Sequence, residues 1–244
     1  MITLIEEMSF NAVPSLETLF YDGWIIRLSK GYTKRANSVN PLYPSTLDIN
    51  SKIDKCENLF HHKNLPIIFK LTSGDFHQGL DSTLKEKGYT SIEPTSVRVL
   101  DIRNIPSPTI NSIKISSSLE DRWLMDYCRF SDISPQHMYI VKTTLASIIP
   151  EKYFITLMDK DIPVACGMGV LENNYIGLFN LVVDKRFREK GYGQQLLLNL
   201  LNLGRDKGAQ YSYLQVMIRN IPAVHLYNKF GFKEKYRYWY RVKL

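Results

Sequence analysis

One segment constrains the fold of this chain more than any other: an apolar strand that runs into a glycine-containing loop and then directly into a helix. The strand ends at 181–183, the loop holds Gly191 and Gly193, and a leucine-rich helical pattern begins at Gln194. Glycine lets a backbone approach a ligand closely, and the first amides of a helix point outward in a field that favours negative charge. The segment therefore suits a pyrophosphate, although a tight strand-to-helix connection would have the same pattern. Three basic residues in the loop would add attraction for an anion: Arg186, Arg188 and Lys190.

The hydrophobic pattern around this segment predicts an α/β (α+β) fold, with a mixed, mostly antiparallel sheet flanked by helices. Polar stretches at 159–161 and 172–174 are typical of hairpin turns. Ser118 is a suitable N-cap for the first helix after it, and Gly231 suits a left-handed helix end. From residue 110 onward we expect an edge strand at 110–115, helices at 119–128 and 136–148, strands at 153–158, 163–171 and 175–183, a helix at 194–205, a strand at 211–218, a helix at 222–230 and a strand at 236–242.

The first hundred residues give a shorter version of the same order, which indicates a diverged repeat. Asn37 and Gly88 have the same separation as Asn180 and Gly231, and the two pairs are offset by 143 positions. A stretch containing Pro and Ser, 102–118, separates the halves, so we expect two domains, 1–105 and 110–244. In the first half the predicted elements are strands at 23–28 and 34–39, a helix at 51–61, a strand at 67–71, a helix at 80–87 and a strand at 95–101.

A second motif follows the glycine loop about thirty residues later. Residues 220–232 read Asn-Ile-Pro-Ala-Val-His-Leu-Tyr-Asn-Lys-Phe-Gly-Phe. Together with Arg188-x-x-Gly191-x-Gly193, this motif resembles the GNAT family of acetyl-CoA-dependent N-acetyltransferases. The family signatures are an Arg/Gln-x-x-Gly-x-Gly/Ala loop and a downstream Asn…Ala-x-x-Leu-Tyr-x-Lys-x-Gly-Phe. The resemblance covers roughly residues 112–244 and implies a GNAT-like acyl-CoA N-acyltransferase fold, with a second, diverged GNAT-like domain in the first half.

The resemblance implies acetyl-CoA as co-substrate, an amine-bearing acceptor, and direct transfer in a ternary complex. Backbone groups of 181–183 would pair with the pantetheine arm, and an amide near Val182 would stabilise the oxyanion. Tyr227 would be the general acid, because a phenol with a pKa of about 10 is protonated at neutral pH. Asn220 would contact the cofactor arm or hold the last helix. The residues implied in donor binding are Leu181, Val182, Val183, Arg188, Glu189, Lys190, Gly191, Tyr192, Gly193, Gln194 and Asn220.

The general base stays open at this point. Many family members carry a Glu on the strand before the loop, but residues 175–183 contain no carboxylate. Glu172, Asp126 and an ordered water are the alternatives. Cys166 lies among apolar residues in a predicted strand, so we do not expect covalent catalysis through it. The absent Glu also leaves open a GNAT fold that senses acyl-CoA without turnover.

The first half lacks the residues that carry this chemistry. At the offset of 143, the counterparts of Arg188, Gly191 and Gly193 are Ser45, Asp48 and Asn50, and the counterpart of Tyr227 is Leu84. The first half therefore resembles the degenerate half of tandem GNAT proteins, with a structural role on the acceptor side. Two residues of its polar stretch 31–41 are candidate acceptor contacts, or else belong to a solvated loop: Arg35 and Asn37.

Charge is concentrated in the second half of the chain. Residues 1–110 carry 12 Lys+Arg and 12 Asp+Glu, so the net +7 lies entirely in 111–244. A basic block indicates an anionic partner, and CoA is a small polyanion. The alternation of aromatic and basic residues at 236–241 fits base stacking, but also a half-buried terminal strand. A nucleic-acid-binding module is therefore the less favoured alternative.

The remaining features narrow the class of protein. Cys56, Cys128 and Cys166 lack paired spacings and are predicted to be reduced core thiols. The histidines, His77 among them, show no metal-ligand spacing, so no metal is expected. The N-terminus has no signal-peptide pattern, and no uncharged apolar run approaches the ~18 residues of a membrane span. We therefore expect a cytoplasmic protein that is a monomer or homodimer.

Overall fold

The computed structural model describes residues 1–74 and 79–243 of the chain, so His77 lies outside the described residues. Packing divides the chain into two compact units. The first consists of Met1–Val97, Val216–Ile221 and the residues from Glu234 onward, and the second of Arg98–Gln215 and Pro222–Lys233. The expected domains, 1–105 and 110–244, are each one unbroken segment. The two units are not, because the C-terminal strand packs in the first unit.

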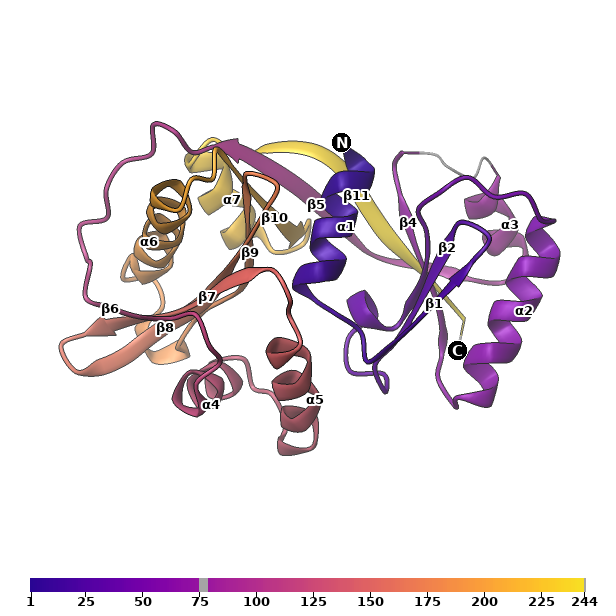
Figure 1. Ribbon diagram of the computed structural model, residues 1–244, viewed down its shortest axis with the longest axis horizontal. Helices are drawn as coiled ribbons and strands as arrows, with labels where there is room; N and C mark the ends of the chain where they lie inside the picture. Colours follow the sequence, from indigo (N-terminus) through magenta and orange to yellow (C-terminus); the bar gives the residue numbers. More distant parts are fainter. Residues whose placement is uncertain (75–78, 244) are drawn as a thin grey trace. The chain divides into compact units, whose positions relative to one another are not determined.

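The first unit is a mixed sheet with helices on both faces. Its strands lie in the order β1-β2-β3-β4-β11-β5. Figure 1 shows α1 on one face of this sheet and α2 and α3 on the other. The elements are α1 (Ile2–Ala12), β1 (Glu17–Tyr21), β2 (Trp24–Leu28), the 3₁₀ helix η1 (Lys34–Ala36), β3 (Ser38–Pro41), α2 (Ile49–His62), β4 (Ile67–Thr72), α3 (Leu80–Glu86), β5 (Thr90–Asp101) and β11 (Lys233–Lys243).

Aromatic side chains form the centre of the first unit's core. Trp24 and Tyr89 both meet the ring of Phe69 edge-on, with ring centroids 5.7 and 5.5 Å apart. Ile53 and Phe60 of α2 close the cluster with no exposed surface. Such edge-to-face pairs add to the free energy that burial contributes, so this half has a core of its own.

The second unit is a sheet in the order β5-β10-β9-β8-β7-β6, to which β5 contributes its last residues. From β6 to β9 neighbouring strands are antiparallel, and β9 pairs with β10 in parallel. Helix α6 lies on one face of this sheet, and α4 and α5 lie on the other (Figure 1). The elements are β6 (Ile113–Ser116), α4 (Asp121–Phe130), α5 (Pro135–Ala146), β7 (Glu151–Asp159), β8 (Ile162–Glu172), β9 (Tyr175–Val183), η2 (Lys185–Phe187), α6 (Tyr192–Asp206), β10 (Tyr211–Met217) and α7 (Ile221–Lys229).

Helix α6 packs closely on the sheet. Its leucines at 196, 197, 200 and 201 are buried. Gly204 lies so near the sheet that a Cβ on it would come within 2.6 Å of Ile176 Cγ2, a distance that side chains do not tolerate. This close approach holds α6 against β8 and β9 and thereby determines where its N-terminus lies.

The predicted fold class is confirmed, with differences at particular elements. The edge strand is β6, and the turn residues Lys160, Asn173 and Asn174 have positive φ, as hairpin turns favour. Gly231 has φ +86°, so the left-handed position after α7 is confirmed. The strand predicted at 34–39 is wrong, because 34–36 form η1 and the strand begins at Ser38. The N-cap of α4 is Glu120 rather than Ser118.

The alternating aromatic and basic residues at 236–241 belong to a half-buried strand, β11. Tyr236, Tyr238 and Tyr240 are buried, whereas Arg237 is exposed. Their rings are therefore not available to stack on bases, and the half-buried strand is confirmed. The three cysteines are free and buried, as predicted.

Candidate functional site

Strand β9 carries a bulge and then an open edge. Cys166 of β8 pairs with Val182 of β9, and Met168 pairs with Phe179. Two steps along β8 therefore correspond to three steps along β9. Asn180 lies within this bulge with φ +56°, a left-handed conformation that Asn tolerates better than most residues. The pairing of β9 with β10 ends at Leu178, so the described residues give the next stretch of β9 no strand partner on that side.

The N-terminus of α6 lies directly after this open edge. Its N-cap is Gly191, with φ +83°, and no side chain caps the helix. The amides of Tyr192, Gly193 and Gln194 precede the first intrahelical donor, the Gln195 amide, which donates to the Gly191 carbonyl at 3.1 Å. They are therefore free to bind a ligand. A Cβ built on Gly193 would lie 3.6 Å from Val183 Cγ2, which places the start of the helix beside the end of the open strand. The structure therefore brings 181–183 and 191–194 together.

The loop between them contains both neutralised and unpaired cations. Asp184 is buried and accepts hydrogen bonds from the Arg186 guanidinium, whose Nη2 lies 2.7 Å from Asp184 Oδ2. This hydrogen bonding lowers the pKa of the Asp184 carboxyl. Lys185 pairs with Asp132. Arg186 is therefore ion-paired, whereas Arg188 and Lys190 form no ion pair with any described residue.

The other predicted loop residues have their own surroundings. Arg188 Nε lies 3.5 Å from the Val183 carbonyl oxygen, and Lys190 Nζ lies over the Phe187 ring at 5.3 Å. Glu189 has φ +64°. The Tyr192 hydroxyl donates to Asp159 at 2.6 Å, so its side chain is held at the β7–β8 turn and only its amide remains at the loop.

Helix α7 lies alongside the N-terminus of α6. A Cβ on Gly193 would be 4.0 Å from Leu226 Cδ2, and Lys229 Nζ lies 3.4 Å from Gln194 Oε1. Tyr227 follows Leu226, and its ring meets Phe232 edge-on with centroids 5.7 Å apart. Burial raises the pKa of Tyr227 to about 12. The phenol therefore stays protonated throughout the neutral range.

Three sequence candidates lie in other settings. Asn220 belongs to the segment Val216–Ile221 of the first unit, and its amide donates to the Met217 carbonyl at 2.9 Å. Asn37 is wrong as an acceptor contact, because it is buried and its side chain organises its own loop. Its Oδ1 accepts the amides of Ser29 and Gly31, and its Nδ2 donates to the Thr33 carbonyl. Arg35 contributes its carbonyl oxygen to the Arg27 guanidinium at 2.6 Å.

The alternatives for a base differ in their surroundings. Asp126 is buried and accepts a hydrogen bond from Arg129 at 2.7 Å, which ties up its carboxylate. Glu172 lies at the β8–β9 turn, at the far end of β9 from the bulge. One pair at the bulge itself was not predicted: the Tyr127 hydroxyl donates to Asn180 Oδ1 at 3.2 Å. An Asn inside an apolar strand was the available signal.

Cys166 lies on β8 beside the bulge. Cys166 has no exposed surface, and burial raises the pKa of its thiol well above the usual value. A buried thiol of this kind is a poor nucleophile. Within residues 1–74 and 79–243, no cluster of His, Cys, Asp and Glu could hold a metal ion. Among the same residues, none of the helices combines the length and the hydrophobicity of a membrane span.

Comparison with protein families decides the class of the molecule. Residues 1–241 match a family described as the C-terminal part of a probable histone acetyltransferase, Rv0428c. The chain belongs to this acetyltransferase family. A Bacillus subtilis protein named as the uncharacterized N-acetyltransferase YobR is 28% identical over 247 residues, covering 99% of this chain and 98% of the relative.

Solved structures give the same fold. A GCN5-related N-acetyltransferase from Kribbella flavida has a TM-score of 0.72 at 12% identity, covering 99% of this chain and 95% of the other. A tandem GNAT protein from the clavulanic acid biosynthesis pathway has a TM-score of 0.62 at 12% identity, covering 80% of this chain and 69% of that one. The GNAT resemblance of the sequence is confirmed: the chain is a GNAT-type N-acetyltransferase with the acyl-CoA N-acyltransferase fold.

Proposed function

We propose that this N-acetyltransferase takes its acetyl group from acetyl-CoA and transfers it directly to a primary amine in a ternary complex. The observation that carries the proposal is the open edge of β9 next to the uncapped N-terminus of α6. An extended pantetheine arm needs backbone partners, and a pyrophosphate needs amides at a helix start. Both features lie side by side in the second unit.

In this proposal, different residues bind different parts of acetyl-CoA. Leu181, Val182 and Val183 offer backbone groups to the pantetheine arm. The amides of the 191–194 segment bind the pyrophosphate, with Gly191 supplying the left-handed turn. The unpaired cations Arg188 and Lys190 add attraction for the donor's negative charge. Asn220 is assigned to the cofactor arm or to fixing α7, which begins at the next residue.

Tyr227 is proposed as the acid. The amine nitrogen forms a bond to the acetyl carbon, the carbon–sulfur bond breaks, and sulfur leaves as a thiolate. Tyr227 can hand its proton to that sulfur, while the attacking nitrogen releases a proton to solvent. The raised pKa of Tyr227, about 12, favours a phenol that is protonated before each turnover. An amide near Val182 would stabilise the oxygen as it gains charge.

The acceptor is an open part of the proposal, and a panel assay addresses it. CoA-thiol release would be followed with polyamines, amino acids and lysine-containing peptides, the last because the family description names a histone acetyltransferase. We expect release with at least one amine, and Tyr227→Phe to reduce kcat with little change in acetyl-CoA affinity. Unchanged kcat would remove Tyr227 from the acid role, and acetyl-CoA binding without any release would favour a sensor.

The first unit is proposed to be the diverged partner of a tandem pair. Elements of the two halves coincide at the offset of 143: Asp48 and Gly191 are both N-caps, of α2 and α6. Gly88 and Gly231 share φ +86°. The following residues repeat as well, because Tyr89 N donates to Leu84 O at 2.9 Å and Phe232 N to Tyr227 O at 3.0 Å. This correspondence supports a common origin, with Leu84 in place of the acid.

An internal carboxylate supports a first half that does not bind CoA. Asp22, in the β1–β2 turn, accepts the amides of Thr46 at 3.0 Å and Leu47 at 2.9 Å and the hydroxyl of Ser45 at 2.7 Å. These amides lie in the loop before α2, the counterpart of the loop before α6. Hydrogen bonding from the Leu47 amide lowers the pKa of Asp22 far below its usual range. Asp22 thus occupies two amides of the loop, and Asp48 accepts the Ser51 amide at the start of α2 at 2.9 Å, so carboxylates of the chain itself already bind donors that a phosphate would use.

A further inference from the structure

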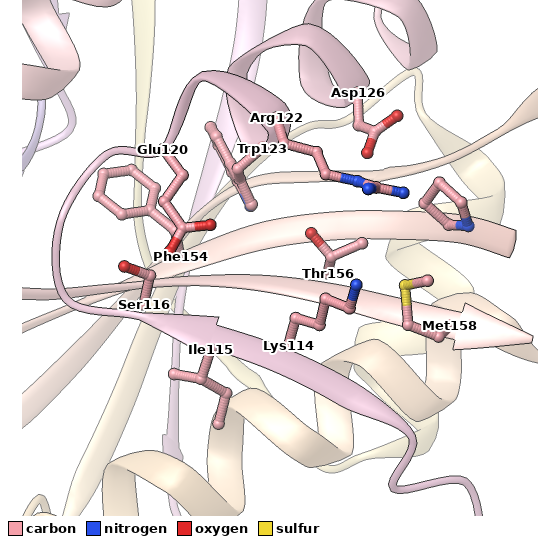
Figure 2. A pocket seen from close by; sticks show the side chains of 11 residues that line it. Lys114, Ile115, Ser116, Glu120, Arg122, Trp123, Asp126, Phe154, Thr156 and Met158 are labelled. Atoms are coloured by element: carbon pink, nitrogen blue, oxygen red, sulfur yellow. The ribbon is translucent and has the colours of Figure 1, made fainter. Parts of the chain in front are cut away.

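A pocket of about 290 Å³ lies in the second unit between α4 and the edge of the sheet. Lys114 of β6 is the direct cross-strand partner of Thr156 on β7, so their side chains share one face of the sheet. Helix α4 covers that face with Arg122 and Trp123 (Figure 2). The residues that line the pocket are Lys114, Ile115, Ser116, Glu120, Arg122, Trp123, Asp126, Phe154, Thr156, Met158 and Pro163.

One end of the pocket holds hydrogen-bond donors from three lining residues: Lys114, Arg122 and Thr156. Figure 2 shows the side chains of Lys114 and Arg122 extending in the same direction, with Thr156 between them. Neither cation forms an ion pair with a described residue. Thr156 is 7% exposed, and its hydroxyl has no hydrogen-bond partner in the described part of the chain. Because no buried side-chain polar atom of the described residues lacks a partner, this hydroxyl is open to the pocket, where it can donate to a ligand oxygen.

The two carboxylates of the pocket lie at different ends. Asp126 lies near Arg122 in Figure 2, and its Oδ1 is already paired with Arg129. Glu120, which has no ion-pair partner among the described residues, lies with Ser116 at the opposite end from Lys114 and Arg122 (Figure 2). Trp123, Phe154 and Met158, all at most 5% exposed, form an apolar wall between the ends. Trp123 is held in place by a hydrogen bond from its Nε1 to the Ile155 carbonyl at 3.0 Å.

We propose that this pocket binds a small zwitterion. Its carboxylate would accept hydrogen bonds from Lys114, Arg122 and the Thr156 hydroxyl, its short apolar chain would lie on Trp123, and its ammonium would face Glu120. The volume suits a molecule of amino-acid size, because sites for drug-sized ligands begin near ~300 Å³. The proposal concerns binding in the absence of acetyl-CoA, so it stands or fails separately from the proposed function.

The test is a titration of the full chain with unbranched ω-amino acids from 4-aminobutyrate to 6-aminohexanoate. The matching carboxylates and alkylamines are the comparison compounds. Binding is read from the ¹³C-methyl NMR signal of Met158, assigned through Met158→Leu. We expect one ω-amino acid to shift this signal saturably. It should bind about tenfold tighter than the matching carboxylate or alkylamine, because each of these lacks one charged group and the hydrogen bonds that the group forms. No saturable shift, or equal binding by the carboxylate and the amine, would overturn the proposal.

Substitutions distinguish binding in this pocket from a general effect of surface charge. Lys114→Gln/Arg122→Gln is expected to weaken binding at least about tenfold, and Thr156→Val several-fold. Glu120→Gln should reduce the affinity of the ω-amino acid to that of its carboxylate. Lys160→Gln/Lys235→Gln removes two exposed cations elsewhere and should leave binding unchanged. An equal loss in this control, or a loss of acetyl-CoA affinity in Lys114→Gln/Arg122→Gln, would contradict a separate site.

Discussion

The Tyr127 hydroxyl donates a hydrogen bond to the side-chain oxygen of Asn180, at 3.2 Å, where β9 bulges away from regular pairing. Asn180 Nδ2 in turn lies 3.8 Å from Met168 Sδ. The ring of Tyr127 is stacked on Trp123, with centroids 5.3 Å apart. Helix α4 therefore holds the side chain at the point where β9 parts from β10 and its edge becomes free for a ligand.

The bulge can be tested by separating its backbone from its side chain. Asn180→Gly keeps the left-handed conformation without strain, whereas Asn180→Ala loses both the conformation and the amide. We expect the Ala variant to have a free energy of unfolding about 1 kcal/mol lower than the Gly variant, measured by urea denaturation. Tyr127→Phe should cost about 1 kcal/mol. Equal stability of the two Asn180 variants would contradict a strained backbone at this position.

The glycines of the loop should respond differently to substitution. Gly191 needs φ +83°, so Gly191→Ala is expected to cost about 1–2 kcal/mol of stability. A Cβ at Gly193 meets only ordinary contacts with Val183 and Leu226, so Gly193→Ala should fold normally. Gly193→Val would fill the space beside the open strand, and we expect acetyl-CoA affinity to fall by about tenfold or more. Calorimetric titration beside thermal melts measures both; unchanged affinity in a folded Gly193→Val would place the donor elsewhere.

Asp184 should make stability depend on pH on the acid side. Because the folded-state pKa of its carboxyl is lowered by Arg186, the unfolded state binds the proton more tightly. Its contribution to the free energy of unfolding is complete above the unfolded pKa of about 4 and is lost as pH falls through the folded pKa. We expect Asp184→Asn to be destabilising at pH 7 and less so at pH 3, measured with urea. The exposed Asp206→Asn is the control, and a difference that grows on acidification would be the wrong sign.

A buried ion pair in the first unit gives a test of that core. The Lys70 ammonium pairs with Glu6, both side chains being at most 3% exposed, and the Tyr236 hydroxyl donates to the same carboxylate at 2.7 Å. Burial lowers the pKa of Lys70. Glu6→Met leaves an uncompensated buried charge and should cost about 3–5 kcal/mol, whereas Glu6→Met/Lys70→Met should cost less. Additive losses in the double-mutant cycle would show that the two groups do not depend on each other.

Donor stoichiometry tests the proposed division between the halves. Because Asp22 satisfies the amides before α2, we expect one acetyl-CoA per chain by calorimetry. Asp22→Asn should lower stability without adding a second site, since Leu84 and Asn50 stand where the second half has Tyr227 and Gly193, the residues proposed to act on the donor. Two equivalent sites in the unsubstituted chain would show that the first half binds the donor.

Much of the fold could be predicted from local sequence patterns. The hairpins around Lys160 and Asn174, the helix ending before Gly231 and the edge strand at Ile113 all follow from turn chemistry and periodicity that act within a few residues. The prediction at 34–39 failed because of a contact outside that stretch. Asn37 Oδ1 accepts the amides of Ser29 and Gly31, and this holds the 3₁₀ turn in front of the strand.

Residue types at short spacings were enough to locate the glycine loop, to place Tyr227 in its motif and to indicate the family. Tertiary contacts decide which loop charges are paired, since Asp184 pairs with Arg186 but no acid among the described residues pairs with Arg188 or Lys190. They also decide that β9 leaves β10 after Leu178 and that the side chains of Thr156 and Lys114 share one face of the sheet. These are relations between distant segments, and they depend on register and packing that no local pattern encodes.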